Sequence, residues 1–189
     1  MDTFLKYHLV ISKERYRAET QKRSFSAPES DKLSVLEIAP DYDTFRALLN
    51  RVGGPWGWPE RACYENRDEI EEMLAQADTR LFLFRRSTQT IGFSLVAAPL
   101  LGSALAMPGC IEIEKFGLYP EHTGKKYGRY FLPALFEKLF ESHDSVYLNT
   151  RNTNHAGVVP FYESLGMHVF HSETLPDDRK QAGSDTTKK

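Results

Sequence analysis

Residues 111–129 read IEIEKFGLYPEHTGKKYGR, and this stretch decides the fold. It joins a β-rich run, a turn that contains Gly124 and Gly128, and the start of an apolar helical pattern that continues to Phe140. A helix that begins just after such a turn leaves its first backbone N–H groups unpaired, and these groups attract anions. We therefore predict a strand, a turn and a helix that hold a phosphate group, although an ordinary solvated turn fits the same residues.

The turn supplies the expected phosphate contacts. Its members are Thr123, Gly124, Lys125, Lys126, Tyr127 and Gly128. The two lysines and Arg129 add positive charge that suits a pyrophosphate. The turn contains neither Gly-x-x-x-x-Gly-Lys-Ser/Thr nor Gly-x-Gly-x-x-Gly, so no motif favours a nucleoside triphosphatase or a dinucleotide-binding protein. Pro133 predicts either a kinked helix or a helix whose regular part begins near Leu132.

The strand before the turn changes the parity of its apolar positions. Ile111 and Ile113 are followed by Phe116 and Leu118, so the alternation slips by one residue. A β-bulge would produce this slip, would separate the strand from a neighbour and would leave the backbone around Gly117 open to an extended ligand. The alternative is a central strand that is buried on both faces, where parity carries no information.

The whole chain of 189 residues carries 24 Lys and Arg against 26 Asp and Glu, a formal charge of −2. These values, with 41% hydrophobic residues, are typical of one water-soluble globular domain. We predict an N-terminal arm over residues 1–31, one domain over 32–175 and a disordered tail over 176–189.

Composition also excludes several classes of function. The chain has no concentrated basic block, which argues against nucleic-acid binding. No apolar run approaches the roughly 18 residues that a membrane span requires, so we expect a cytoplasmic protein without a membrane partner. Cys63 and Cys110 lack the spacing of a zinc site or a disulfide framework, and we expect no metal.

Strand and helix patterns surround the central stretch. We expect strands at 33–40, 80–86, 90–101, 146–151 and 167–175, and helices from Asp41 or Asp43 to Gly53, over 69–77 and over 156–165. The runs at 80–86 and 90–101 would form a hairpin. This order predicts a mixed α/β domain.

The residues EIEKFGLYPEHTGKKYGRYFL (112–132) and YLNTRNTNHAGVVPFYESLGM (147–167) resemble the GNAT superfamily of acyl-CoA-dependent N-acetyltransferases. The resemblance extends over residues 33–175, and the stretches GGPWGW and NHAGVVPFY are similar to a bacterial GNAT subgroup of undefined substrate. It implies a mostly antiparallel central sheet with splayed parallel strands, flanked by helices, and acetyl-CoA as co-substrate. In the family's loop pattern, Arg/Gln-x-x-Gly-x-Gly/Ala, Thr123 replaces Arg or Gln, Lys126 replaces the first Gly, and Gly128 is kept.

The same resemblance implies roles for five residues or segments. Tyr162 would be the general acid for the leaving thiolate, where the alternative is a core tyrosine that shares one hydrogen bond. Asn154 would contact the pantetheine arm, or serve as a helix N-cap. Glu112, ranked first, or Glu114 would be the general base, where the alternative is a pair of exposed strand carboxylates. Backbone amides of Phe116, Gly117 and Leu118 would polarise the thioester carbonyl.

The amine acceptor is left open. Trp56, Trp58 and Arg61 would line its pocket, or their loop would plug the core, and exposed aromatic surface there could serve a homodimer. We predict an N-acetyltransferase that acts on a small-molecule or peptide amine. The alternative is a non-catalytic acyl-CoA sensor or interaction module on the same scaffold; a hydrolase would need a Gly-x-Ser-x-Gly motif that is absent.

Overall fold

The computed structural model describes residues 3–21, 31–56, 66–99, 109–154 and 157–176. The strands are β1 (Thr3–Ser12), β2 (Leu33–Ile38), β3 (Arg80–Arg86), β4 (Gln89–Ala97), β5 (Cys110–Leu118), β6 (Ser145–Arg151) and β7 (His168–Pro176). The α-helices are α1 (Lys13–Thr20), α2 (Tyr42–Gly53), α3 (Arg67–Leu74), α4 (Gly128–Leu139) and α5 (Val158–Glu163). Two short 3₁₀ helices are η2 (Gly54–Trp56) and η4 (Pro120–His122). The predicted tail lies outside the described residues except for Pro176, which ends β7.

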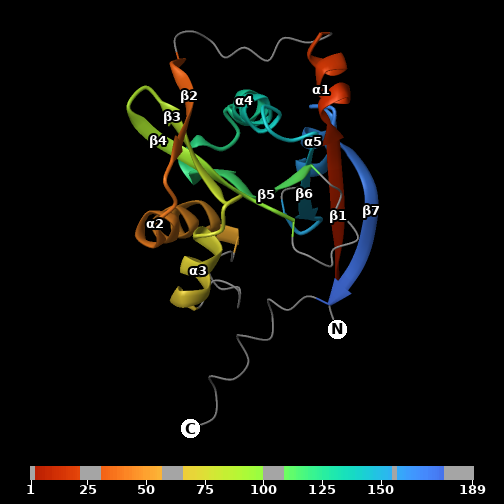
Figure 1. Ribbon diagram of the computed structural model, residues 1–189. Helices are drawn as coiled ribbons and strands as arrows, with labels where there is room; N and C mark the ends of the chain where they lie inside the picture. The colour runs from red at the N-terminus through yellow and green to blue at the C-terminus, as the bar shows by residue number, and fades with distance from the viewer. Residues whose placement is uncertain (1–2, 22–30, 57–65, 100–108, 155–156, 177–189) are drawn as a thin grey trace.

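The strands form one seven-stranded sheet in the order β2-β3-β4-β5-β6-β1-β7 (Figure 1). All neighbouring strands are antiparallel except β5 and β6, which run parallel. The prediction of a mixed α/β fold with a mostly antiparallel sheet is therefore confirmed.

Helices cover the sheet from both sides. On one face, α1, α4 and α5 contribute Tyr16, Phe131 and Tyr162 to the larger hydrophobic core. On the other face, α2 and α3 contribute Phe45 and Ile70 to a second core over β3 and β4. In Figure 1, α4 and α1 lie above the sheet, and α2 and α3 lie below its β2 end. The alternation of apolar residues along β3 serves both cores, because successive side chains of a strand point to opposite faces.

The expected N-terminal arm is wrong for residues 3–20. β1 lies inside the sheet between β6 and β7, and the side chains of Leu9 and Ile11 are fully buried. α1 follows at once, with Ser12 as its N-cap. The partners of β1 come from the last third of the chain, so no pattern local to residues 1–31 could show that this charged segment completes the sheet.

The predicted β-bulge is present in β5. Leu95 of β4 pairs with Lys115, while the next residue, Val96, pairs with Ile113, so Glu114 is the extra residue. The parallel pairing of β5 with β6 is limited to three residues, from Cys110 to Glu112. Beyond them the two strands separate, and the expected splay is confirmed.

The helices α2 and α4 start differently. Asp41 caps α2, since its Oδ1 accepts the backbone N–H of Thr44 at 2.9 Å. α4 begins at Gly128 with no side-chain cap, and Pro133 lies inside it. The alternative of a helix that starts near Leu132 is therefore wrong, and the uncapped end of α4 faces the turn.

Candidate active site

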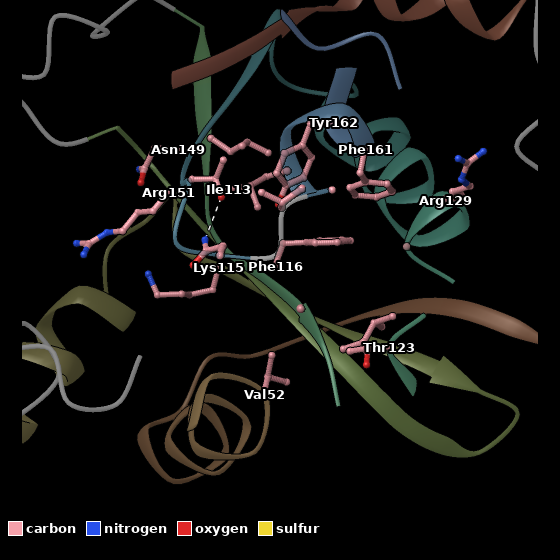
Figure 2. A pocket seen from close by; sticks show the side chains of 18 of the residues that line it. Val52, Ile113, Lys115, Phe116, Thr123, Arg129, Asn149, Arg151, Phe161 and Tyr162 are labelled. Atoms are coloured by element: carbon pink, nitrogen blue, oxygen red, sulfur yellow. Dashed lines mark hydrogen bonds between the residues drawn. The ribbon is translucent and has the colours of Figure 1, made fainter. Parts of the chain in front are cut away.

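A cavity of about 580 Å³ opens where β5 and β6 separate (Figure 2). The predicted site residues that line it are Glu114, Phe116, Gly117, Leu118, Thr123, Gly124, Lys126, Tyr127, Gly128, Arg129, Asn154 and Tyr162. Its size is that of a small-molecule or cofactor site. Among the described residues, Glu112 and Lys125 are not part of the lining. The side chains of Trp56, Trp58 and Arg61 lie outside the described residues.

The turn before α4 presents a row of unpaired amides. Thr123, Arg129 and Tyr130 donate their backbone N–H groups to carbonyls one turn back. Within the described parts of the chain, the N–H groups of residues 124–128 have no such acceptor. Successive free amides at the positive end of a helix form an anion site, so the geometry fits a phosphate group.

Two positions of the turn correspond to glycines in the family's loop pattern: Lys126 replaces one, and Gly128 keeps the other. Lys126 has φ +64°, in the left-handed region that glycine adopts at low cost, yet a lysine stands here. At Gly128, an added Cβ would lie 3.1 Å from Cζ of Phe161 on α5. Gly128 therefore allows α4 and α5 to approach closely, whereas the lysine at position 126 costs some backbone strain.

The free edge of β5 forms a wall of the cavity. Phe116, Gly117 and Leu118 pair with β4 on one side, while the edge toward β6 has no partner beyond Glu112 among the strands that the structure describes. Strand edges without partners offer N–H and C=O groups to an extended ligand.

Tyr162 points into the cavity from α5 (Figure 2). The residue is buried, and burial raises the pKa of its hydroxyl, which is therefore a neutral phenol near pH 7. Among the described residues, none accepts or donates a hydrogen bond at this hydroxyl. The alternative of a core tyrosine that shares a hydrogen bond therefore finds no support in the described structure.

Asn154 does not cap α5, so the N-cap alternative is wrong. Gly157 precedes the helix, and no side-chain cap is present. Nδ2 of Asn154 instead donates to Oγ1 of Thr150 at 3.0 Å, and the residue lines the cavity. This hydrogen bond holds the side-chain amide of Asn154 at the wall of the cavity.

The two glutamates have different surroundings. Glu112 is 7% exposed and accepts a hydrogen bond from Nδ2 of Asn149 at 3.0 Å. Burial, and then the charge of Glu114, raise its pKa to about 7. Glu114 occupies the bulge, and its Oε1 accepts from Nζ of Lys115 at 2.8 Å. The alternative of two exposed strand carboxylates is wrong for Glu112. Its carboxylate does not line the cavity but is hydrogen-bonded to Asn149, which does.

Several lining residues were missed by the sequence analysis. Lys6, Lys115, Asn149 and Arg151 all line the cavity. Lys6 was missed because its strand was interpreted as an arm. Asn149 and Arg151 carried a signal, since both are polar and occupy alternate positions of β6, which places them on one face of the strand.

The chain belongs to the acetyltransferase (GNAT) family, whose sequence model matches residues 42–167. The fold is that of this acyl-transferring class. No curated protein matches the chain in sequence. In the parts of the chain that the structure describes, no helix combines the length and apolar character needed to cross a bilayer.

Solved structures share the fold at low identity. A GCN5-related N-acetyltransferase from Sphaerobacter thermophilus is 17% identical with a TM-score of 0.60, over 91% of this chain and 50% of that chain. A conserved protein of unknown function from Staphylococcus epidermidis is 14% identical with a TM-score of 0.58, over 92% and 60%. An aminoglycoside acetyltransferase from an uncultured soil metagenomic sample, solved with sisomicin, is 11% identical with a TM-score of 0.54, over 70% and 87%. The chain spans 60% of the length of the Staphylococcus protein and 63% of that of a further structural relative, a GNAT-family acetyltransferase from Novosphingobium aromaticivorans.

Proposed function

We propose that this protein is an N-acetyltransferase that moves the acetyl group of acetyl-CoA to a primary amine by direct attack. One observation carries the proposal: a single cavity is lined both by the turn with unpaired amides and by the hydroxyl-bearing Tyr162. When bound, acetyl-CoA supplies an activated acyl group at one end and a pyrophosphate at the other. A cavity with an anion site and a neutral acid at separate places suits such a molecule.

The binding roles follow from the backbone. The N–H groups of residues 124–128 hold the pyrophosphate, and the side chains of Lys126 and Arg129 add charge. The open edge of β5 at 116–118 holds the extended arm and polarises the thioester carbonyl. Because most of these contacts are made by main-chain atoms, the replacement of a family glycine by Lys126 is compatible with binding.

The transfer forms a C–N bond and breaks a C–S bond. The amine nitrogen attacks the carbonyl carbon, and Glu112 takes the proton that the nitrogen loses, by way of a water molecule, because the carboxylate lies behind Asn149. A base with a pKa of about 7 is half ionised at neutral pH, which suits this task. Tyr162 gives its proton to the departing sulfur.

Two measurements on the full chain test the proposal. Calorimetry with acetyl-CoA should show binding, and release of free thiol in the presence of an amine panel should show transfer. Binding without turnover on any amine would favour the alternative, a non-catalytic acyl-CoA sensor. Absence of binding would overturn both and favour an interaction module.

A further inference from the structure

Three basic side chains gather at the end of the cavity away from α4. Lys6 comes from β1, Lys115 from β5 and Arg151 from β6, and all three line the cavity. Figure 2 shows Lys115 and Arg151 on the side opposite Arg129, which lies in the first turn of α4, next to the phosphate turn. The cavity therefore has a second cationic end, which the pyrophosphate site does not use.

The fold holds these cations together at a cost. Lys6 and Arg151 are direct cross-strand partners of β1 and β6, and like charges in that position destabilise a sheet. The bulge at Glu114 turns Lys115 to the same face of the sheet. Both lysines are close enough to Glu112 for their charges to act on its carboxylate.

The charged groups of Lys6, Lys115 and Arg151 are each oriented by contacts with neighbouring side chains. The guanidinium carbon of Arg151 lies 3.9 Å from the ring centre of Phe4. Nζ of Lys6 is 3.6 Å from Glu173, a carboxylate that is not part of the lining, and Nζ of Lys115 is 2.8 Å from Glu114. Among the described lining residues, Glu114 is the sole carboxylate against these three cations.

This end of the cavity is lined by three basic side chains and one carboxylate, Glu114, which is unfavourable for an acceptor that carries several positive charges. It favours an acceptor with an anionic group, because basic side chains attract and bind such a group. The planar fork of Arg151 matches a carboxylate or a phosphate.

Resting on the proposed N-acetyltransferase function, we propose that the acceptor is an amine that also carries an anionic group, a carboxylate or a phosphate, held by Lys6, Lys115 and Arg151. The anionic group is bound at this end of the cavity, and the amine is thereby directed toward the thioester. The anionic group undergoes no reaction. This class includes amino acids and aminoalkyl phosphates, and it excludes polyamines.

Matched amines test the proposal by the release of free thiol from acetyl-CoA. The pairs are L-lysine with cadaverine, L-phenylalanine with phenethylamine, and phosphoethanolamine with ethanolamine; spermidine is the polycation. We expect kcat/KM to be roughly tenfold or more higher for the anionic member of at least one pair. The first two pairs report on a carboxylate and the third on a phosphate.

Substitutions of Arg151 and Lys6 test whether these residues cause the preference for the anionic amine. Arg151→Gln and Lys6→Gln should each reduce the preference by roughly tenfold through KM for the anionic member. In Arg151→Gln the member without the anionic group should change by about twofold or less, whereas Lys6→Gln also removes a charge that lowers the pKa of Glu112 and can slow both members. Arg17→Gln, an exposed charge on α1 outside the cavity, should leave both members unchanged. Arg151→Lys, which keeps the charge, should restore part of the preference and guards against a folding defect in the glutamine variant.

The outcomes separate the two proposals. Transfer with an anionic preference that Arg151→Gln removes supports both. Transfer that prefers spermidine or the members without an anionic group overturns the assignment of the acceptor class and leaves the acetyltransferase proposal standing. Acetyl-CoA binding without transfer to any amine overturns both.

Discussion

Nδ2 of Asn149 donates a hydrogen bond to Oε1 of Glu112 at 3.0 Å. Asn149 lines the cavity, and Glu112 lies behind it on β5. The contact joins a buried carboxylate with a raised pKa to the place where an amine would lose its proton. It also stabilises the ionised form of that carboxylate, because the amide donates to it.

The pH dependence of the reaction should follow Glu112. A base must be ionised to act, so kcat/KM should rise with pH through about 7. Glu112→Gln should abolish this rise and lower kcat/KM by roughly 10² to 10⁴. Asn149→Ala removes a donor to the ionised form, so the rise should move to higher pH. The measurement is the pH profile of thiol release.

Glu141→Gln, at an exposed carboxylate outside the cavity lining, is the control for these profiles and should reproduce the wild-type curve. A Glu112→Gln variant that keeps both the rate and the pH dependence would remove Glu112 from the base role. Glu114→Gln would then be the next variant to compare.

Stability should also depend on the protonation of Glu112. In the folded protein this carboxyl holds its proton up to about pH 7, whereas in the unfolded chain it ionises near its ordinary pKa of 4.5. The folded state thus binds more protons between these values, and its stability falls as pH rises through that window. Glu112→Gln should therefore become more stable relative to wild type by up to about 3 kcal/mol between pH 5 and pH 8. Urea unfolding at the two pH values measures this, and a constant difference would contradict it.

Tyr162→Phe should slow the chemical step. The hydroxyl has no hydrogen-bond partner among the described residues, so its loss should cost little stability but remove the proton for the leaving sulfur. We expect single-turnover acyl transfer to fall by roughly 10² or more, with acetyl-CoA binding changed by about twofold or less. Tyr42→Phe, on α2, is the matched control. Unchanged chemistry in Tyr162→Phe would exclude the acid role.

Gly128→Ala should disturb the contact between α4 and α5. The new Cβ would lie 3.1 Å from Cζ of Phe161, whose ring lines the cavity, so the ring must move. We expect a loss of about 1 kcal/mol in the free energy of unfolding and weaker acetyl-CoA binding. Gly54→Ala is the control, because a Cβ there meets nothing within 4 Å. Equal effects of the two substitutions on binding would argue against the close approach.

At Lys126, two substitutions separate backbone strain from charge. Lys126→Gly and Lys126→Ala both remove the positive charge, but only glycine relieves the left-handed φ of +64°. The glycine variant should be more stable than the alanine variant by about 1 kcal/mol. Both should weaken acetyl-CoA binding to a similar extent, whereas Lys125→Ala, outside the cavity lining, should not. Thermal unfolding and calorimetry measure the two effects; binding equal to wild type in both variants would show that the charge is not used.

Local patterns in the sequence were enough to predict most of the described helices and strands and part of the candidate active site. The parity slip between Ile113 and Phe116 predicted the bulge, because side chains of a strand alternate strictly between faces. The glycines around residues 123–128 predicted the turn, because their backbone freedom is a property of the residues themselves. The positions of Asp41 and of the apolar helix predicted where α2 and α4 lie.

Only the tertiary structure decided which segments meet. β1 joins the sheet through partners more than 130 residues away, and this pairing brings Lys6 to Arg151. The contact of Asn149 with Glu112 and the approach of Gly128 to Phe161 likewise join segments that are distant in the chain. Composition and periodicity report the preferences of neighbouring residues, whereas burial, raised pKa values and the cationic end of the cavity arise from contacts made across the fold.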